Sequence, residues 1–173
     1  AQGQVSRDLT LVPHVVLCGG TGSGKSVLLK LMLMQCLKQP NISVTIADFK
    51  GGVDFGGNWR KHPNCKLILD RETLIAYLDS VAEKLEQRKD LLGKAECTNI
   101  YAYNSREAIP MDRIVFAVDE VAEILDKTGL TKAEKEQVAR IANRLSPIPR
   151  PGPPVGLPLV PPPQTPGADI HSG

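Results

Sequence analysis

The sequence lacks the features that mark disulfide-built, zinc-binding or membrane-embedded chains. Its four cysteines, Cys18, Cys36, Cys65 and Cys97, form no Cys-x-x-Cys pair and have no histidine grouping near them, so neither a zinc site nor a redox motif is indicated. No apolar run approaches the roughly 20 residues of a membrane span, and the N-terminus lacks the layout of a signal peptide. We therefore expect a cytoplasmic protein with reduced core thiols. Because the chain begins at Ala1, a membrane anchor or further domain elsewhere in the parent protein stays open.

A strong excess of either charge is also missing. Lysine and arginine number 21 against 19 acidic residues, for a net charge of +2. Any nucleic-acid contact must then come from local basic patches or from oligomerisation, so composition neither favours nor excludes DNA as a partner. The 173 residues suit one domain that buries roughly two thirds of its unfolded surface.

The most informative segment is a phosphate-binding motif near the N-terminus. The pattern G-x-x-x-x-G-K-[ST] is matched in full, and the candidate ATP-binding residues are Gly19, Gly20, Thr21, Gly22, Ser23, Gly24, Lys25, Ser26 and Val27. Successive backbone N–H groups would surround the phosphates, Lys25 would neutralise the β and γ oxygens, and the Ser26 hydroxyl would bind Mg²⁺. The alternative is a glycine-rich turn with a chance Lys-Ser. The motif requires a strand before it and a helix after it, and residues 14–18 and 27–37 have suitable compositions.

A second candidate segment lies about ninety residues further on. Residues 114–118 form an apolar run typical of a buried strand, and Asp119 and Glu120 follow it directly. Asp119 could hold Mg²⁺ directly or through water, and Glu120 could polarise an attacking water molecule. An apolar strand that ends in two carboxylates also occurs by chance, but the preceding phosphate motif favours the functional interpretation.

The pattern along the rest of the chain predicts alternating strands and helices. Residues 42–48 read as a buried strand that ends at Asp48, and residues 66–70 as a short extra strand. Apolar residues at spacings of three and four predict an amphipathic helix over 72–92. Further helical patterns cover 121–127 and begin again at Thr131, where Thr131 and Glu134 fit a capping box.

The last segment has a different composition. Ten of the fourteen prolines lie between Pro147 and Pro166, and no helix or central strand tolerates that density of missing N–H donors. A polyproline-type tail is the simplest interpretation. We therefore divide the chain into an entry segment (1–13), a core (14–146) and a proline-rich tail (147–173).

Together these motifs resemble the FtsK/SpoIIIE family, in the versions encoded by conjugative elements. The resemblance rests on the phosphate motif, on the segments Asp48-Phe49-Lys50-Gly51-Gly52 and Tyr103-Asn104, and on the strand that ends in Asp119-Glu120. It implies an α/β fold, namely a RecA-like P-loop NTPase core with a mostly parallel sheet flanked by helices, truncated at the C-terminus. It also implies ATP and Mg²⁺ as cofactors, Lys25 and Glu120 as catalytic residues, Ser26 and Asp119 as metal ligands, and Gln164 as a possible sensor of the γ-phosphate.

The family's members are ATP-driven ring motors, usually hexameric, that move double-stranded DNA, and a related branch drives type VII protein secretion. We therefore expect the ATP-hydrolysing domain of a DNA translocase that serves conjugative transfer or chromosome segregation. Protein secretion and a nucleotide-binding fragment without turnover stay open as alternatives. Arg60 and Lys61 could contact DNA or a neighbouring subunit, or lie in a solvated loop. A catalytic arginine for a neighbouring subunit could be Arg140, Arg144 or Arg150.

Overall fold

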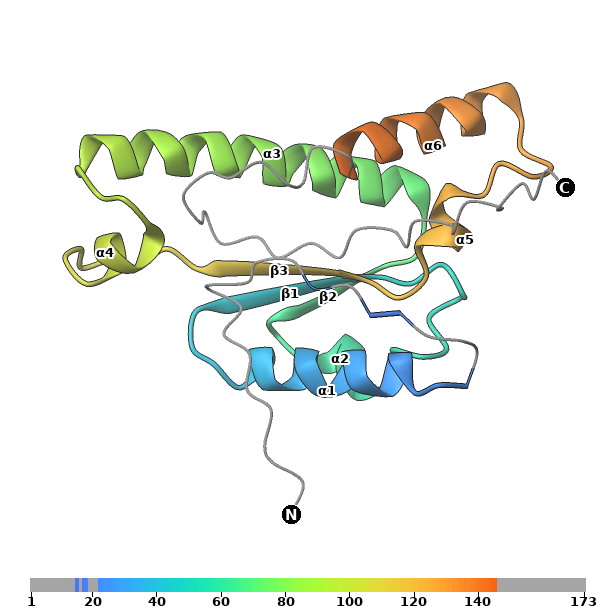
Figure 1. Cartoon of the computed structure of the whole chain (residues 1–173), viewed down its shortest axis with the longest axis horizontal. Helices are drawn as coiled ribbons and strands as arrows, with labels where there is room; N and C mark the ends of the chain where they lie inside the picture. Colours follow the sequence, from blue (N-terminus) through green and yellow to red (C-terminus); the bar gives the residue numbers. More distant parts are fainter. Residues whose placement is uncertain (1–14, 16, 19–21, 146–173) are drawn as a thin grey trace, which may run out of the picture.

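The computed structural model describes residues 15, 17–18 and 22–145, and its centre is a parallel sheet of three strands (Figure 1). The strands are β1 (Ile42–Ala47), β2 (Cys65–Ile68) and β3 (Arg113–Val118), in the order β2-β1-β3. Both pairings are parallel, with Val44 opposite Cys65 and Ala47 opposite Val118. The carboxyl ends of all three strands therefore meet at one edge of the sheet, where open α/β sheets place their ligands.

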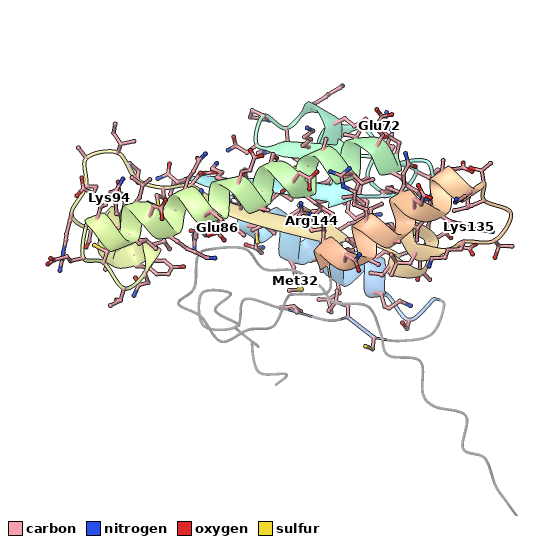
Figure 2. The ribbon with its side chains drawn as sticks, turned by 90° about the horizontal axis from the view of Figure 1, so that it is seen from above. Met32, Glu72, Glu86, Lys94, Lys135 and Arg144 are labelled. Atoms are coloured by element: carbon pink, nitrogen blue, oxygen red, sulfur yellow. The ribbon has the colours of Figure 1, made fainter. Side chains whose placement is uncertain are left out.

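Helices cover both faces of this sheet (Figure 1). On one face lie α3 (Arg71–Lys94), α5 (Val121–Leu125) and α6 (Lys132–Leu145), and on the other α1 (Lys25–Leu37) and α2 (Asn58–Lys61). The short α4 (Ile100–Asn104) precedes the amino end of β3. From above, α6 lies beside the first half of α3 (Figure 2). This is the α/β architecture with a parallel sheet flanked by helices that the sequence predicts.

Alternating side chains of the strands divide the core in two. Along β3, Val115 and Ala117 join a cluster with Leu29 and Leu33 of α1, while Phe116 joins the cluster that packs against α3, α5 and α6. Residues 114–118 are all buried, as expected for a strand covered on both faces. Each helical layer therefore stabilises the sheet from its own side.

Two element ends can be compared with the sequence. Asp70, predicted as the last residue of a strand, lies beyond the end of β2 and instead caps α3, since its carboxylate accepts a hydrogen bond from the Thr73 N–H at 2.8 Å. The capping box at α6 is confirmed, because the Glu134 carboxylate accepts from the Thr131 N–H at 2.8 Å while the Thr131 hydroxyl accepts from the Glu134 N–H at 3.3 Å. Among the residues that the structure describes, no helix combines the length and apolar composition needed to cross a bilayer.

Two expectations about the N-terminal region need comment. Of the strand predicted over residues 14–18, the described residues Val15, Leu17 and Cys18 lie in no assigned strand, and the rest of that stretch lies outside the described residues. All four cysteines are free, but the prediction that they are core thiols is fully met only by Cys36, which is buried. Cys65 and Cys97 are partly buried, and the prediction is wrong for Cys18, which is exposed. The proposed segments 1–13 and 147–173 lie outside the described residues.

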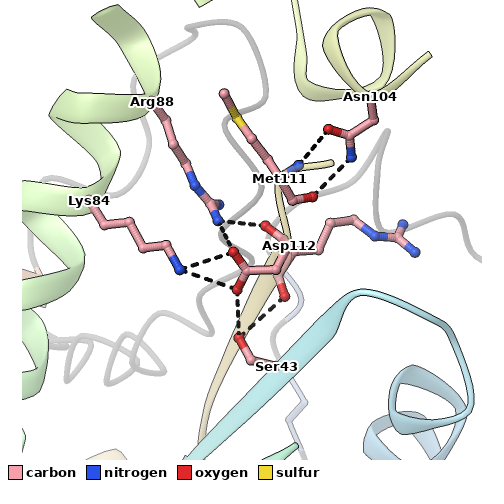
Figure 3. A network of polar contacts seen from close by, with 7 residues as sticks. Ser43, Lys84, Arg88, Asn104, Met111 and Asp112 are labelled. Atoms are coloured by element: carbon pink, nitrogen blue, oxygen red, sulfur yellow. Dashed lines mark hydrogen bonds and ion pairs between the residues drawn. The ribbon is translucent and has the colours of Figure 1, made fainter. Parts of the chain in front are cut away.

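A polar network joins the amino ends of β1 and β3 to α3 (Figure 3). Arg88, which is 3% exposed, donates to the Asp112 carboxylate at 2.5 Å and to the Asp112 carbonyl oxygen at 2.6 Å. Lys84 and Ser43 also donate to this carboxylate, at 3.0 and 3.3 Å. The Asn104 side chain bonds both the N–H and the carbonyl of Met111. These contacts fix the start of β3 at the end of the sheet opposite the candidate site.

Candidate nucleotide site

The described part of the phosphate motif forms a left-handed turn that leads into α1. Gly22 and Gly24 have φ angles of +76° and +87°, a conformation that glycine adopts without steric penalty. The Leu28 N–H donates to the Gly24 carbonyl at 2.9 Å, and no side chain caps the helix. The free end of a helix of 13 residues offers N–H groups and a positive dipole end to an anion.

The predicted binding residues take up consistent positions within this turn. Ser23 lies in the turn, Lys25 and Ser26 begin α1, and Val27 follows in its first turn with 61% of its surface exposed. The prediction for Gly19, Gly20 and Thr21 concerns residues outside the described ones.

The two halves of the predicted site meet in the structure. The Ser26 hydroxyl donates to the Asp119 Oδ1 atom at 3.1 Å, across 93 positions of sequence. Ser26 is in place because α1 starts at Lys25, and Asp119 because β3 ends at Val118. The Asp119 side chain is only 4% exposed, and its Oδ2 atom is buried without a hydrogen-bond partner. An oxygen in this situation is ready to bind a cation.

Asp48 lies at the same edge of the sheet, next to Asp119. The Asp119 N–H donates to the Ala47 carbonyl at 3.3 Å, and the Asp48 N–H donates to the Ile68 carbonyl at 3.0 Å. Asp48 is 1% exposed, and its Oδ1 atom accepts the Lys50 N–H at 3.0 Å. Its Oδ2 atom is buried without a partner. The turn after β1 is therefore held by the carboxylate that the sequence places there.

Lys50 is a site residue that sequence reasoning did not single out. Its ammonium lies 3.4 Å from Glu120 Oε2 and 3.6 Å from Asp119 Oδ2. Burial alone would lower the pKa of Lys50, but the charges and hydrogen bonds of Asp119 and Glu120 raise it above its ordinary value. The sequence marks Lys50 only as part of the segment Asp48-Phe49-Lys50-Gly51-Gly52 that follows a predicted strand. Its pairing with Asp119 and Glu120 depends on β1 and β3 being neighbours.

The glycine-rich loop after Lys50 is anchored to the core by its far end. Phe55 is fully buried and meets Trp59 edge-on at 5.4 Å between ring centroids. The Lys30 ammonium of α1 lies 3.0 Å from the Asp54 carboxylate and 5.4 Å from the centre of the Phe55 ring. The loop is therefore tied to the helix that carries the phosphate motif.

The residues present fit a magnesium ion that arrives with a nucleotide. Ser26 and Asp119 supply two oxygen atoms side by side, the type of ligand that Mg²⁺ prefers. Within residues 15, 17–18 and 22–145, no group of three or more His, Cys, Asp or Glu side chains is arranged to hold a metal. The ion would have to complete its shell with phosphate oxygens and water, as is usual for Mg²⁺ at nucleotide sites.

A separate open hollow lies between the start of α3 and the segment that runs from α5 into α6. It has a volume of about 560 Å³, and its lining includes the carboxylates of Asp70, Glu72, Glu123, Asp126 and Glu134, with one basic residue, Arg71. This excess of negative charge would repel a triphosphate. The hollow therefore does not compete with the α1 terminus as the nucleotide site.

The other candidate residues are not brought to the site by the described structure. Arg140 and Arg144 of α6 both pair with Asp79 of α3, so they join the two helices on the surface. Arg60 and Lys61 are exposed on α2. Gln164 and Arg150 lie outside the described residues.

The helix α1 begins at Lys25, directly after the glycines of the phosphate motif, and packs on a parallel sheet in which Asp119 and Glu120 follow β3. This arrangement defines the chain as a P-loop NTPase of the RecA-like type. Comparison with known proteins gives the finer assignment. The family model FtsK/SpoIIIE matches residues 2–145, and the chain belongs to this family.

Three relatives illustrate the likeness. The DNA translocase FtsK of Helicobacter pylori strain J99 is 31% identical over 180 residues, which cover 96% of this chain and 19% of that protein. The pCW3 conjugation coupling protein TcpA, solved as a monomer with ATPγS, superposes with a TM-score of 0.84 at 31% identity, over 93% of this chain and 45% of that one. EssC from Geobacillus thermodenitrificans gives a TM-score of 0.59 at 19% identity, over 84% of this chain and 27% of that one.

The chain spans about a fifth of the length of the first of these relatives. The EssC likeness, at 19% identity, shows the fold alone. The family and its conjugation-protein neighbour confirm the resemblance read from the sequence.

Proposed function

We propose that this chain is the Mg²⁺-dependent, ATP-hydrolysing motor domain of a double-stranded DNA translocase. The observation that carries the proposal is the 3.1 Å contact between the Ser26 hydroxyl and Asp119. It joins the phosphate motif to Asp119 and Glu120 at the end of β3, the two segments that would together form the hydrolytic site.

In the proposed reaction, different residues of the chain bind the phosphates, bind the metal and activate the attacking water. The N–H groups at the start of α1 and the Lys25 ammonium hold the phosphates, and Ser26 and Asp119 hold the metal. Bound Mg²⁺ would neutralise charge on the β and γ oxygens. Glu120 would orient a water molecule and accept its proton as the water oxygen attacks the γ-phosphorus. The bond between that phosphorus and the oxygen bridging to the β-phosphate then breaks, giving ADP and phosphate.

DNA is the cargo that the relatives favour. FtsK of Helicobacter pylori carries the name DNA translocase, and TcpA is a conjugation coupling protein, so transfer of a conjugative element is the process we propose. The type VII branch, represented by EssC, shares the fold at 19% identity. By the family resemblance, the parent protein would work as a homo-oligomeric, hexameric ring in the cytoplasm.

The experiment is an ATPase assay with and without linear duplex DNA. We expect hydrolysis that DNA stimulates, that Lys25→Ala abolishes, and that Glu120→Gln abolishes while ATPγS binding persists. Lys38→Ala is a matched control, because it also removes one positive charge, at the carboxyl end of α1. It should leave the rate of ATP hydrolysis unchanged both with and without DNA. Hydrolysis that survives in Glu120→Gln would refute the role of Glu120.

Two further outcomes separate the alternatives. Hydrolysis that duplex DNA does not stimulate at low ionic strength would contradict the DNA cargo and favour a protein-transporting motor, since motor contacts with DNA are electrostatic and strongest in low salt. ATPγS binding without hydrolysis under any condition would show a nucleotide-binding fragment.

A further inference from the structure

Lys50 occupies a position that the proposed function leaves without a role. Its ammonium lies between two carboxylates that are both assigned to catalysis, at 3.6 Å from Asp119 and 3.4 Å from Glu120. The Asp119 Oδ2 atom is buried and without a hydrogen bond, and it is the Asp119 oxygen that the Lys50 ammonium approaches. A positive charge therefore already lies where the metal charge is needed.

The ion pairs of the Lys50 ammonium with Asp119 and Glu120 are weak enough for another cation to replace Lys50. Both distances exceed the 2.7–2.9 Å of a strong charge-assisted hydrogen bond, and the Lys50 side chain is 37% exposed. Water and salt screen such a pair, so it is weak compared with a buried one. The backbone of Lys50, by contrast, is held by the bond from its N–H to Asp48. The side chain can leave while the turn stays in place.

We infer that Lys50 is a positioning residue that holds Asp119 and Glu120 in the nucleotide-free protein and yields its place to the metal when a nucleotide enters. The inference rests on the proposed roles of Ser26, Asp119 and Glu120. One consequence follows. Without nucleotide, Lys50 competes with a divalent cation for Asp119, so the metal binds together with the nucleotide and not ahead of it.

The test measures metal binding without nucleotide or turnover. Mn²⁺, an oxygen-binding substitute for Mg²⁺, is titrated into the nucleotide-free protein, and free Mn²⁺ is followed by electron paramagnetic resonance. Removing a unit charge a few ångström from the site should tighten Mn²⁺ binding about tenfold in Lys50→Met at low ionic strength. The gain should vanish in Lys50→Met/Asp119→Asn, and Lys50→Arg should behave as wild type because it keeps the charge.

Lys89→Met is the matched control. Lys89 pairs with Glu86 on the exposed surface of α3, so the substitution changes the net charge equally without touching the site. An unchanged Mn²⁺ affinity in Lys50→Met, or an equal gain in Lys89→Met, would overturn the inference. ATPγS binding measured by calorimetry in Mg²⁺ keeps the two proposals apart. If wild type fails to bind ATPγS, the proposed function fails; if it binds ATPγS while Lys50→Met shows no gain in Mn²⁺ affinity, only the role of Lys50 fails.

Discussion

Replacing Arg88 by methionine tests whether the network at the amino ends of β1 and β3 holds the fold together. Arg88 is 3% exposed and donates to both the carboxylate and the carbonyl of Asp112. Methionine keeps much of the buried aliphatic volume but removes both bonds. Hydrogen bonds to charged groups contribute roughly 1.5–3 kcal/mol each.

The loss should be smaller than the sum of two such bonds. Asp112 keeps its contacts with Lys84 and Ser43, and its side chain is 37% exposed, so water can replace part of what Arg88 supplied. We expect the free energy of unfolding to fall by about 2 kcal/mol, which is below the range of roughly 3–5 kcal/mol for breaking a fully buried pair. For a chain of this size that corresponds to a decrease of about 4–8 °C in the melting temperature.

Urea unfolding at neutral pH, followed by circular dichroism, measures this loss. Lys89→Met on the same helix is the control, because its exposed pair with Glu86 should contribute at most about 1 kcal/mol. Nucleotide binding should survive in the folded fraction of Arg88→Met, since the network lies at the opposite end of the sheet. An Arg88→Met protein within about 0.5 kcal/mol of wild type would refute the reasoning, because it would show that desolvating Arg88 offsets its bonds.

Three further predictions concern single features. Gly24→Ala should weaken ATPγS binding in calorimetry, because Gly24 has a φ of +87° and a left-handed conformation costs an L-residue roughly 1–2 kcal/mol. Thr131→Ala should lower the free energy of unfolding by about 1 kcal/mol in urea, the usual effect of losing an N-cap side chain. Burial alone would raise the pKa of Asp112, but Lys84, Arg88 and Ser43 hold it below its usual value. The Asp112 carboxylate therefore contributes its full stabilisation of the folded state at pH values above its pKa in the unfolded chain, about 3.9. This contribution is lost as the pH falls through the lower pKa that Asp112 has in the folded protein. Between about pH 5 and pH 2, wild type should lose more stability than Asp112→Asn, and parallel pH profiles would contradict this.

The parts of the fold that depend on local pattern could be predicted from the sequence. The strand before Asp119, the long helix after Asp70 and the capping box at Thr131 all have short-range signals. The predicted limits of 72–92 for the long helix compare with Arg71–Lys94. The approach of Ser26 to Asp119 could also be predicted, because the hydroxyl of a phosphate motif and an aspartate at the end of a strand hold the same Mg²⁺ in P-loop NTPases.

Contacts set by the order of strands could not be predicted in the same way. Lys50 reaches Glu120 because β1 lies beside β3, and nothing near Lys50 in the sequence encodes that neighbour. Phe55 stands among glycines, which give no local sign of burial, yet burial of its aromatic ring decides the position of the loop after Lys50. The burial of Arg88 has no local signal either, because it depends on its contact with Asp112, 24 positions further along the chain.

The anchoring of the Lys50 turn at Asp48 and at Phe55 has a consequence for the rate of cation exchange. The turn at Lys50 is fixed at its start by the Asp48 carboxylate and further along by Phe55 beneath α1. Lys50 can then leave Asp119 and Glu120 by rotating its own side chain, a motion of picoseconds to nanoseconds, whereas collective lid opening takes microseconds or longer. Exchange of cations at this site would be far faster than the roughly 0.001–1 s of a typical catalytic cycle.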